Sequence, residues 1–164
     1  MAKGDRAGRQ PAVRRAEGLR LHAYDDLRPY HLLTPEDEVI GTVTIGYGHV
    51  RTAKPGMEIT AKEAEALLRE DLRRFEAGVT ALTGEVADLK QHEFDALVSF
   101  AFNVGLGALE QSTLLTKLLR GDPRKEVADE FLRWVYSKGR KLRGLEQRRA
   151  DERDVFLGYC VAYG

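Results

Sequence analysis

The segment that follows Thr60 constrains the fold of this chain most. Apolar residues between Ala64 and Phe75 recur at the spacing of one helix face. Ahead of them, Thr60-Ala-Lys-Glu63 has the form of a capping box, whose two side chains satisfy free N–H groups at a helix start. We therefore predict a helix over residues 61–79, which at ~1.5 Å per residue spans roughly 30 Å and can connect two lobes.

The chain before this helix has the pattern of a small sheet. Pro11 suits the first turn of a short helix that reaches Glu17, and Gly18 ends that helix. Residues 19–24 alternate apolar and polar side chains, as a half-buried strand does. Residues 39–47 are rich in valine, isoleucine and threonine, which favours a second strand. The opening residues mix glycine with charge and predict a frayed arm.

The chain after the long helix keeps a helical pattern to its end. Apolar stripes at residues 94–101 and 114–119 predict two helices. A further helix is predicted over residues 123–135, with Asp122 as its N-cap, and a last one over residues 145–157. The sequence therefore predicts an α+β fold that is mainly helical, with a small antiparallel β-hairpin or sheet near the N-terminus.

Length and composition favour one functional unit. A chain of 164 residues is long enough for one domain and too short for two independent ones. Its 43% hydrophobic and 32% charged residues are typical of a soluble globular protein. We predict a single domain over residues 1–164, with a small β-containing lobe and first helix at 1–60, a connecting helix at 61–80 and a helical lobe at 81–164.

The charge of the chain is balanced but clustered. Its 26 basic and 26 acidic residues cancel, so bulk charge does not favour nucleic acid as a partner. Cys160 is the only cysteine, which excludes an intrachain disulfide and a metal site built from several thiolates. Two basic clusters are either solvated faces or surfaces that dock on a polyanion. They comprise Lys3, Arg6, Arg9, Arg14 and Arg15, and Lys138, Arg140, Lys141, Arg143, Arg148 and Arg149.

Glu17 and Asp26 form a candidate pair for acid–base chemistry. Cleaving a glycosidic bond commonly needs one protonated carboxyl group for the leaving oxygen and one ionised group that attacks or activates water. A chain with 26 acids contains many such pairs by chance, so a helix end plus a turn aspartate is the competing interpretation. Asp25 also competes with Asp26, because alternation in a strand does not say which of them faces Glu17.

The sequence Gly46-Tyr-Gly48 permits a tight turn and a close approach of other groups. It is too short for a dinucleotide loop, and no phosphate-binding lysine follows, so a nucleotide site is not predicted. His22, His31 and His92 show no metal-ligand spacing with His49. We therefore predict no metal site, and we expect His49 to pair with a carboxylate of the long helix.

Ordered motifs along most of the chain resemble one known family. Glu17-Gly-Leu-Arg-Leu-His-Ala-Tyr-Asp-Asp26, followed by Thr44-Ile-Gly-Tyr-Gly-His49, is similar to the phage-type lysozymes, the muramidase endolysins of glycoside hydrolase family 24. Several independent motifs in the same order make a chance match improbable. The similarity continues through residues 59–75, 91–119, 131–134 and 144–149.

This resemblance implies a lysozyme-like fold and a role for each matching residue. Glu17 would be the general acid, Asp26 the carboxylate that holds or activates water, and Thr44 a hydroxyl beside that water. An inverting reaction needs room for such a water, and a hydroxyl can both donate and accept in fixing it. The family also implies that His49 bonds Asp71 on the long helix.

The resemblance further implies what the protein acts on. Asn103 and Tyr47 would bind substrate, which is peptidoglycan cleaved at the β-1,4 bond between N-acetylmuramic acid and N-acetylglucosamine. We expect no cofactor, no nucleic acid partner, no membrane anchor or signal peptide, and a monomer. The protein of a phage or prophage would stay in the host cytoplasm until a holin-like protein gives it access to the wall. A non-catalytic wall-binding protein and a lytic transglycosylase are the alternatives.

One segment departs from the family. Most relatives join the aspartate to the threonine by a tight turn, whereas seventeen residues separate Asp26 from Thr44 here. Hairpin loops usually have about 2 to 5 residues, so this insertion is unusually long. It is either an exposed elaboration or a lid that brings Tyr30, His31 or Glu36 to the substrate.

Overall fold

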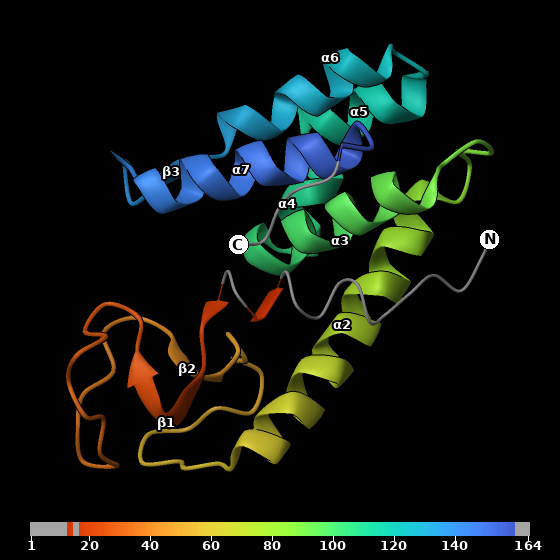
Figure 1. Cartoon of the computed structure of the whole chain (residues 1–164). Coiled ribbons are helices and arrows are strands. Elements are labelled where there is room, and N and C mark those ends of the chain that lie inside the picture. Colours follow the sequence, from red (N-terminus) through yellow and green to blue (C-terminus); the bar gives the residue numbers. More distant parts are fainter. Residues whose placement is uncertain (1–12, 15–16, 160–164) are drawn as a thin grey trace. The chain divides into compact units, whose positions relative to one another are not determined.

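The computed structural model describes residues 13, 14 and 17–159 (Figure 1). The chain forms two compact units, which divide between Arg73 and Arg74. We call them the N-terminal unit and the C-terminal unit. The predicted bounds of a single domain with two lobes remain a prediction. Within the described residues, no helix combines the length and apolar character that a membrane crossing requires.

The N-terminal unit contains a two-stranded antiparallel sheet. Strand β1 (Arg20–Asp25) pairs with β2 (Val43–Gly46), and Tyr24 lies opposite Thr44. Residues 57–59 follow the other edge of β1, where two backbone hydrogen bonds of 2.9 Å join Ala23 to Met57 and Ile59 to Leu21. Both predicted strands are confirmed, although β2 is shorter than predicted.

The alternating pattern of residues 19–24 predicts that the apolar side chains face the interior, but the buried face of β1 is only partly apolar. Ala23 and Asp25 are buried, whereas Leu19 and Leu21 are 41% and 44% exposed. A carboxylate therefore takes an inward position that sequence pattern assigns to apolar residues.

A helical turn precedes β1 and ends as predicted at Gly18. Val13, Arg14 and Glu17 are helical, and Val13 is buried. Gly18 has a φ of +72°, and its N–H donates to the carbonyl of Arg14 at 2.9 Å. This left-handed conformation favours glycine and stops the helix. The predicted helix start at Pro11 and the predicted arm lie outside the described residues.

Helix α2 (Ala61–Thr83) is the long helix that the sequence predicts. Its capping box is present, because the Thr60 N–H donates to the Glu63 carboxylate at 2.8 Å and the Glu63 N–H donates to the Thr60 hydroxyl at 3.1 Å. The helix runs four residues past its predicted end, where the Thr83 hydroxyl donates to the Val79 carbonyl at 2.7 Å. It passes from the N-terminal unit into the C-terminal unit.

The C-terminal unit is a helical assembly around an aromatic core. Phe100, Phe131 and Phe156 are fully buried, and Phe100 makes edge-on contacts with Phe131 and Trp134 at centroid distances of 5.4 and 5.3 Å. The predicted apolar stripes lie on α3 and α5. The helical elements are α3 (Gln91–Val104), α4 (Leu106–Gln111), α5 (Thr113–Arg120), α6 (Arg124–Asp129), the 3₁₀ helix η1 (Glu130–Arg133) and α7 (Arg143–Phe156).

Two predictions for this unit are wrong. Asp122 does not cap α6; Pro123 is the N-cap, and the Asp122 carboxylate binds Arg120 instead. The helix predicted through residue 135 ends early, and a second hairpin follows, formed by β3 (Tyr136–Ser137) and β4 (Arg140–Lys141). Strands of two residues are too short to show an alternating pattern.

Candidate active site

Glu17 lies against the glycine-rich turn that follows β2. Backbone hydrogen bonds of 2.9 Å in both directions join Ile45 and His49 and close this turn, in which Gly46 and Gly48 have φ values of +66° and +77°. A Cβ atom on Gly48 would lie 2.9 Å from the Glu17 Oε2 atom. The glycine therefore provides both the backbone conformation and the space that the Glu17 carboxylate occupies.

Asp26 and Thr44 meet at the backbone of Thr42. The Thr42 N–H donates to Asp26 Oδ1 at 2.8 Å, and the Asp26 N–H donates to the Thr42 carbonyl at 3.1 Å. The Thr44 hydroxyl donates to the same carbonyl at 3.2 Å. Asp26 is exposed and Thr44 is buried, so a solvent-accessible carboxylate and a fixed hydroxyl share the Thr42 backbone as their partner.

The Tyr24 phenol lies among charged side chains of the N-terminal unit. Burial raises the pKa of the Tyr24 phenol, the charge of Arg20 opposes this rise, and the negative charges of Glu17 and Asp26 add to it. The Arg20 guanidinium lies 4.3 Å from the centre of the Tyr24 ring.

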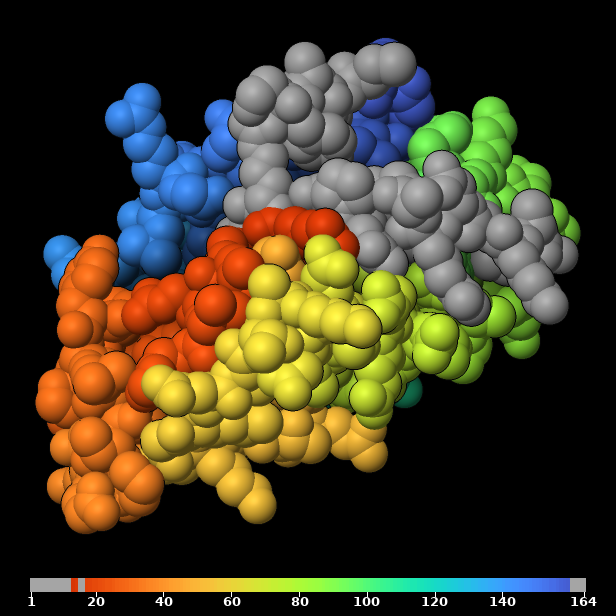
Figure 2. All heavy atoms as spheres, turned by 60° about the horizontal axis from the view of Figure 1, so that its bottom comes forward, coloured from red at the N-terminus to blue at the C-terminus, as the bar shows by residue number. Residues whose placement is uncertain are grey.

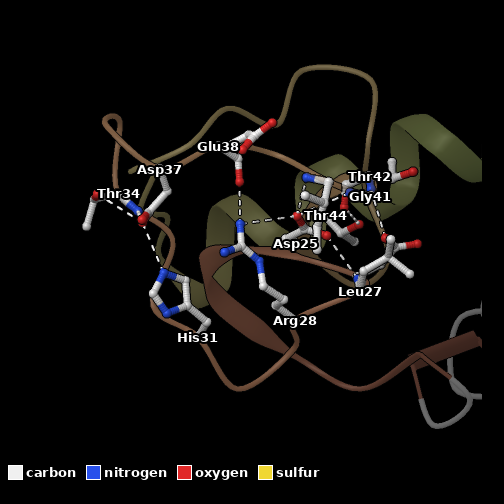
Figure 3. Close-up of polar contacts among 12 residues, drawn as sticks. Asp25, Leu27, Arg28, His31, Thr34, Asp37, Glu38, Gly41, Thr42 and Thr44 are labelled. Atoms are coloured by element: carbon white, nitrogen blue, oxygen red, sulfur yellow. Dashed lines mark hydrogen bonds and ion pairs between the residues drawn. The ribbon is translucent and has the colours of Figure 1, made fainter.

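Asp25 faces the interior and binds backbone groups (Figure 3). Its carboxylate accepts hydrogen bonds from the N–H groups of Leu27 at 2.9 Å, Ile40 at 2.8 Å and Gly41 at 3.2 Å. Desolvation would raise the pKa of Asp25, but these hydrogen bonds and the charge of Arg28 outweigh it and hold the pKa below its usual value. Asp25 is therefore a buried structural anion, and Asp26 is the exposed acid of the two.

His49 is held on both sides of its ring. Its Nδ1 lies 2.7 Å from the Asp71 carboxylate, and its Nε2 lies 2.7 Å from the Thr52 hydroxyl. The Thr52 N–H also points to Nε2 at 3.2 Å, so Nε2 accepts and Nδ1 donates to Asp71. Asp71 and His49 are both buried, and they tie the turn after β2 to α2.

Tyr47 lies at the tip of the same turn. The Arg14 guanidinium lies 5.6 Å from the centre of the Tyr47 ring and 3.1 Å from the Glu65 carboxylate. Arg14 therefore connects the first helix to the turn and to α2.

Asn103 belongs to the C-terminal unit, near the end of α3. Its side-chain oxygen accepts a hydrogen bond from Arg149 at 3.0 Å, and the residue itself is exposed. Arg149 is fully buried and lies 2.8 Å from the Glu152 carboxylate. Burial raises the pKa of Glu152, and the charges of Arg149 and Arg148 oppose that rise.

The insertion between β1 and β2 is an ordered part of the N-terminal unit. We call residues 26–42 the β1–β2 connection; Figure 2 shows it in orange at the surface. Leu33 is fully buried, and its carbonyl accepts from Gly56 at 3.2 Å. Tyr30 is 99% exposed and His31 binds Asp37 at 3.1 Å. The connection thus has one buried apolar anchor, Leu33, and its own polar contacts.

Three positions of this site were not predicted. Thr42 acts through its peptide groups, which no sequence pattern identifies. Gly41 lacks space for a Cβ atom, which would lie 2.5 Å from Asp25 Oδ1 and would also collide with Asp26. Tyr24 could have been found from its place in the Ala-Tyr-x-Asp motif, directly before Asp25 and Asp26 in the sequence. Among the described residues, no group of three or more His, Cys, Asp or Glu side chains is arranged to hold a metal ion.

A mainly helical α+β fold with acids on a small N-terminal hairpin is the architecture of a lysozyme-type glycoside hydrolase. The family described as phage lysozyme matches residues 14–152. This chain therefore belongs to the phage lysozyme family.

Individual relatives extend the match. The endolysin of Bacillus phage B103 is 44% identical over 88% of this chain, but the chain spans only 51% of that protein. The endolysin of Acyrthosiphon pisum secondary endosymbiont phage 1 is 40% identical, with 88% of this chain and 91% of the relative covered. The solved muramidase domain of SpmX from Asticaccaulis excentricus is 35% identical, with a TM-score of 0.76 over 96% of this chain and 99% of that domain. The predicted fold class is confirmed.

Proposed function

We propose that this chain is a muramidase that hydrolyses the β-1,4 bond between N-acetylmuramic acid and N-acetylglucosamine in peptidoglycan and so lyses bacterial cells. Membership of the phage lysozyme family supports the reaction class. Two contacts carry the proposal. The Glu17 carboxylate packs against Gly48 in the turn after β2, and the side chains of Asp26 and Thr44 both bind the backbone of Thr42 in the hairpin.

The proposed reaction divides the work between these residues. Glu17 donates its proton to the oxygen of the leaving sugar as the glycosidic bond breaks. Asp26 accepts a proton from a water molecule whose oxygen bonds to the anomeric carbon, and the Thr44 hydroxyl fixes that water. The two proton transfers balance, so the products are two sugar chains with one water added. Thr42 supports this role, since its N–H holds Asp26 and its carbonyl holds Thr44.

We propose further that the reaction inverts the anomeric configuration. An acid that binds water through an exposed carboxylate and a neighbouring hydroxyl suits direct attack by water better than attack by the carboxylate itself. Proton NMR of a soluble substrate distinguishes the two courses, because inversion first releases the α-anomer from a β-linked chain. Initial release of the β-anomer would contradict this part of the proposal.

The central experiment compares Glu17→Gln with Glu70→Gln. Both substitutions remove one carboxylate from the N-terminal unit, but Glu70 is an exposed residue of α2. We expect Glu17→Gln to lower kcat by about 10² to 10⁴, as loss of a general acid does, and Glu70→Gln to leave it unchanged. Equal activity of Glu17→Gln and the parent protein would refute the assignment.

Mass spectrometry of peptidoglycan digested in oxygen-18 water tests the reaction class. Hydrolysis adds one heavy oxygen to each new reducing end, and the mass of the fragments identifies the bond that was cut. Anhydro-muropeptides without heavy oxygen would instead indicate a lytic transglycosylase. Binding to peptidoglycan without new reducing ends would indicate a wall-binding protein.

We propose, from the resemblance to phage endolysins, that the chain acts as a monomer and reaches peptidoglycan from the host cytoplasm with the help of a separate holin-like protein. Asn103 and Tyr47 are the residues that we propose for substrate binding. Co-expression tests the first point, since lysis should then depend on the holin-like protein. Lysis at the same time with and without that protein would contradict it.

A further inference from the structure

The strongest unexplained feature of the N-terminal unit is the burial of Asp25. Its side chain is inaccessible to solvent, although it lies next to the exposed Asp26. A buried carboxylate is costly unless hydrogen bonds and charges compensate for the lost water. Three backbone N–H groups do so here, and the Arg28 guanidinium lies 3.7 Å away.

The partners of Asp25 come from both ends of the β1–β2 connection. Leu27 lies at the start of the connection, whereas Ile40 and Gly41 lie at its end. Arg28 contributes a second link, because its guanidinium also donates to the carbonyl of Glu38. Holding the two ends of a long loop together has an entropic cost that such contacts offset. The Asp25 carboxylate therefore links both ends of the connection, in addition to the β1–β2 pairing and the hydrogen bonds between Asp26 and Thr42 (Figure 3).

The residues next to these contacts belong to the candidate active site. Asp26 follows Asp25 directly, and Thr42 follows Gly41. The Thr42 N–H binds Asp26, and the Thr42 carbonyl binds Thr44. The position of the Thr42 peptide groups thus depends on where the end of the connection is held.

We propose that Asp25 is a positioning residue for the reaction: by binding both ends of the β1–β2 connection, it places the Thr42 peptide groups that orient Asp26 and Thr44. This inference rests on the proposed function of Asp26 and Thr44. It also assigns a purpose to the burial of a charge that the proposed reaction does not use.

A second carboxylate of the connection provides a matched control. Asp37 accepts from the Thr34 N–H at 2.7 Å and the Thr34 hydroxyl at 3.0 Å, and it binds His31. These contacts organise the middle of the connection and involve neither Thr42 nor Asp26. Asp25→Asn and Asp37→Asn therefore make the same chemical change in the same segment, but only the first affects the proposed linkage.

Kinetics of these two variants on soluble peptidoglycan strands, well below the melting temperature, test the inference. In Asp25→Asn an amide NH₂ replaces one acceptor and opposes a backbone N–H, so we expect kcat to fall about 10- to 100-fold with little change in KM. Asp37→Asn should change neither kcat nor KM.

Asp25→Glu keeps the charge but lengthens the side chain by one methylene, so it should fold and show a smaller loss of kcat. A folded Asp25→Asn variant with the parent kcat would overturn the inference. Hydrogen exchange of the unmodified protein gives a test that needs no variant: the Ile40 and Gly41 amides should be protected, and rapid exchange there would also overturn it. If the parent protein itself releases no reducing ends, the proposed function fails instead.

Discussion

The two described hairpins differ in how the connection between their paired strands is held in place. β1 and β2 are joined by residues 26–42, and the Asp25 carboxylate holds the ends of this connection. β3 and β4 are joined only by Lys138 and Gly139, whose φ values of +51° and +75° suit a two-residue hairpin turn. A short connection is set by its backbone, whereas a long one needs side chains that supply hydrogen-bond acceptors.

The hairpins also differ in charge. The first uses carboxylates as acceptors inside the connection and beside the proposed catalytic residues. The second displays the exposed cations Lys138, Arg140 and Lys141, of which Lys141 lies 2.8 Å from Glu146. We therefore expect substitutions at the ends of the β1–β2 connection to affect catalysis, and substitutions in the second hairpin to affect only stability or surface binding.

The largest difference is expected for loss of the exposed acid. Asp26→Asn should lower kcat at least about 100-fold, because the proposed base is lost, while the fold is retained since Asp26 is exposed. Arg140→Gln, a charge change in the other hairpin, should leave kcat unchanged. Kinetics measure kcat and circular dichroism measures the fold. An Asp26→Asn variant with the parent kcat would contradict the assignment of Asp26 as the base.

A matched pair of glycine substitutions comes next. A Cβ on Gly41 meets the Asp25 carboxylate, which is fixed by its hydrogen bonds, so Gly41→Ala should destabilise by about 1–3 kcal/mol and lower kcat. Gly139 has open space but a positive φ, so Gly139→Ala should cost about 1 kcal/mol and spare kcat. Denaturant unfolding measures the stabilities. Equal kcat values for the two variants would contradict the proposed linkage.

The hairpins should loosen at opposite ends of the pH scale. Hydrogen bonds hold the pKa of Asp25 below its usual value despite desolvation, so its contribution to stability is present above about pH 4 and is lost as pH falls through the folded pKa. The hydrogen bond and charge of Glu146 raise the pKa of Lys141, so its contribution is lost above about pH 10. Hydrogen exchange at the Gly41 and Leu142 amides, corrected for its intrinsic pH dependence, checks both directions. Loss of protection at both amides in acid would contradict the distinction.

The smallest effect concerns the cationic hairpin as a docking surface. If Lys138 and Arg140 help to bind the polyanionic envelope, replacing both by glutamine should lower activity on whole cells a few-fold at low salt and not at high salt. Activity on soluble strands should not change. Lys125→Gln, which removes an exposed cation from α6, is the control. Unchanged whole-cell activity of the double variant at low salt would show that Lys138 and Arg140 do not contribute to envelope binding.

Local signals allowed much of the fold to be predicted. The capping box at Thr60 and Glu63 fixes the start of α2, and Gly18 ends the first helix, because both depend on neighbours within one helical turn. The hairpin after Trp134 was missed because its strands are two residues long. The prediction that Asp122 caps α6 was wrong because Arg120 is a stronger partner for that carboxylate than backbone N–H groups.

The motifs of the sequence by themselves determined the family, the long helix and the set of candidate residues, since these depend on residue types and short spacings. Only the tertiary structure decided that Asp25 is buried and Asp26 exposed, because alternation gives two opposite faces without saying which is covered. It also decided that Thr42 joins Asp26 to Thr44, because peptide groups are the same at every position and acquire a role only when the β1–β2 connection brings them to a partner.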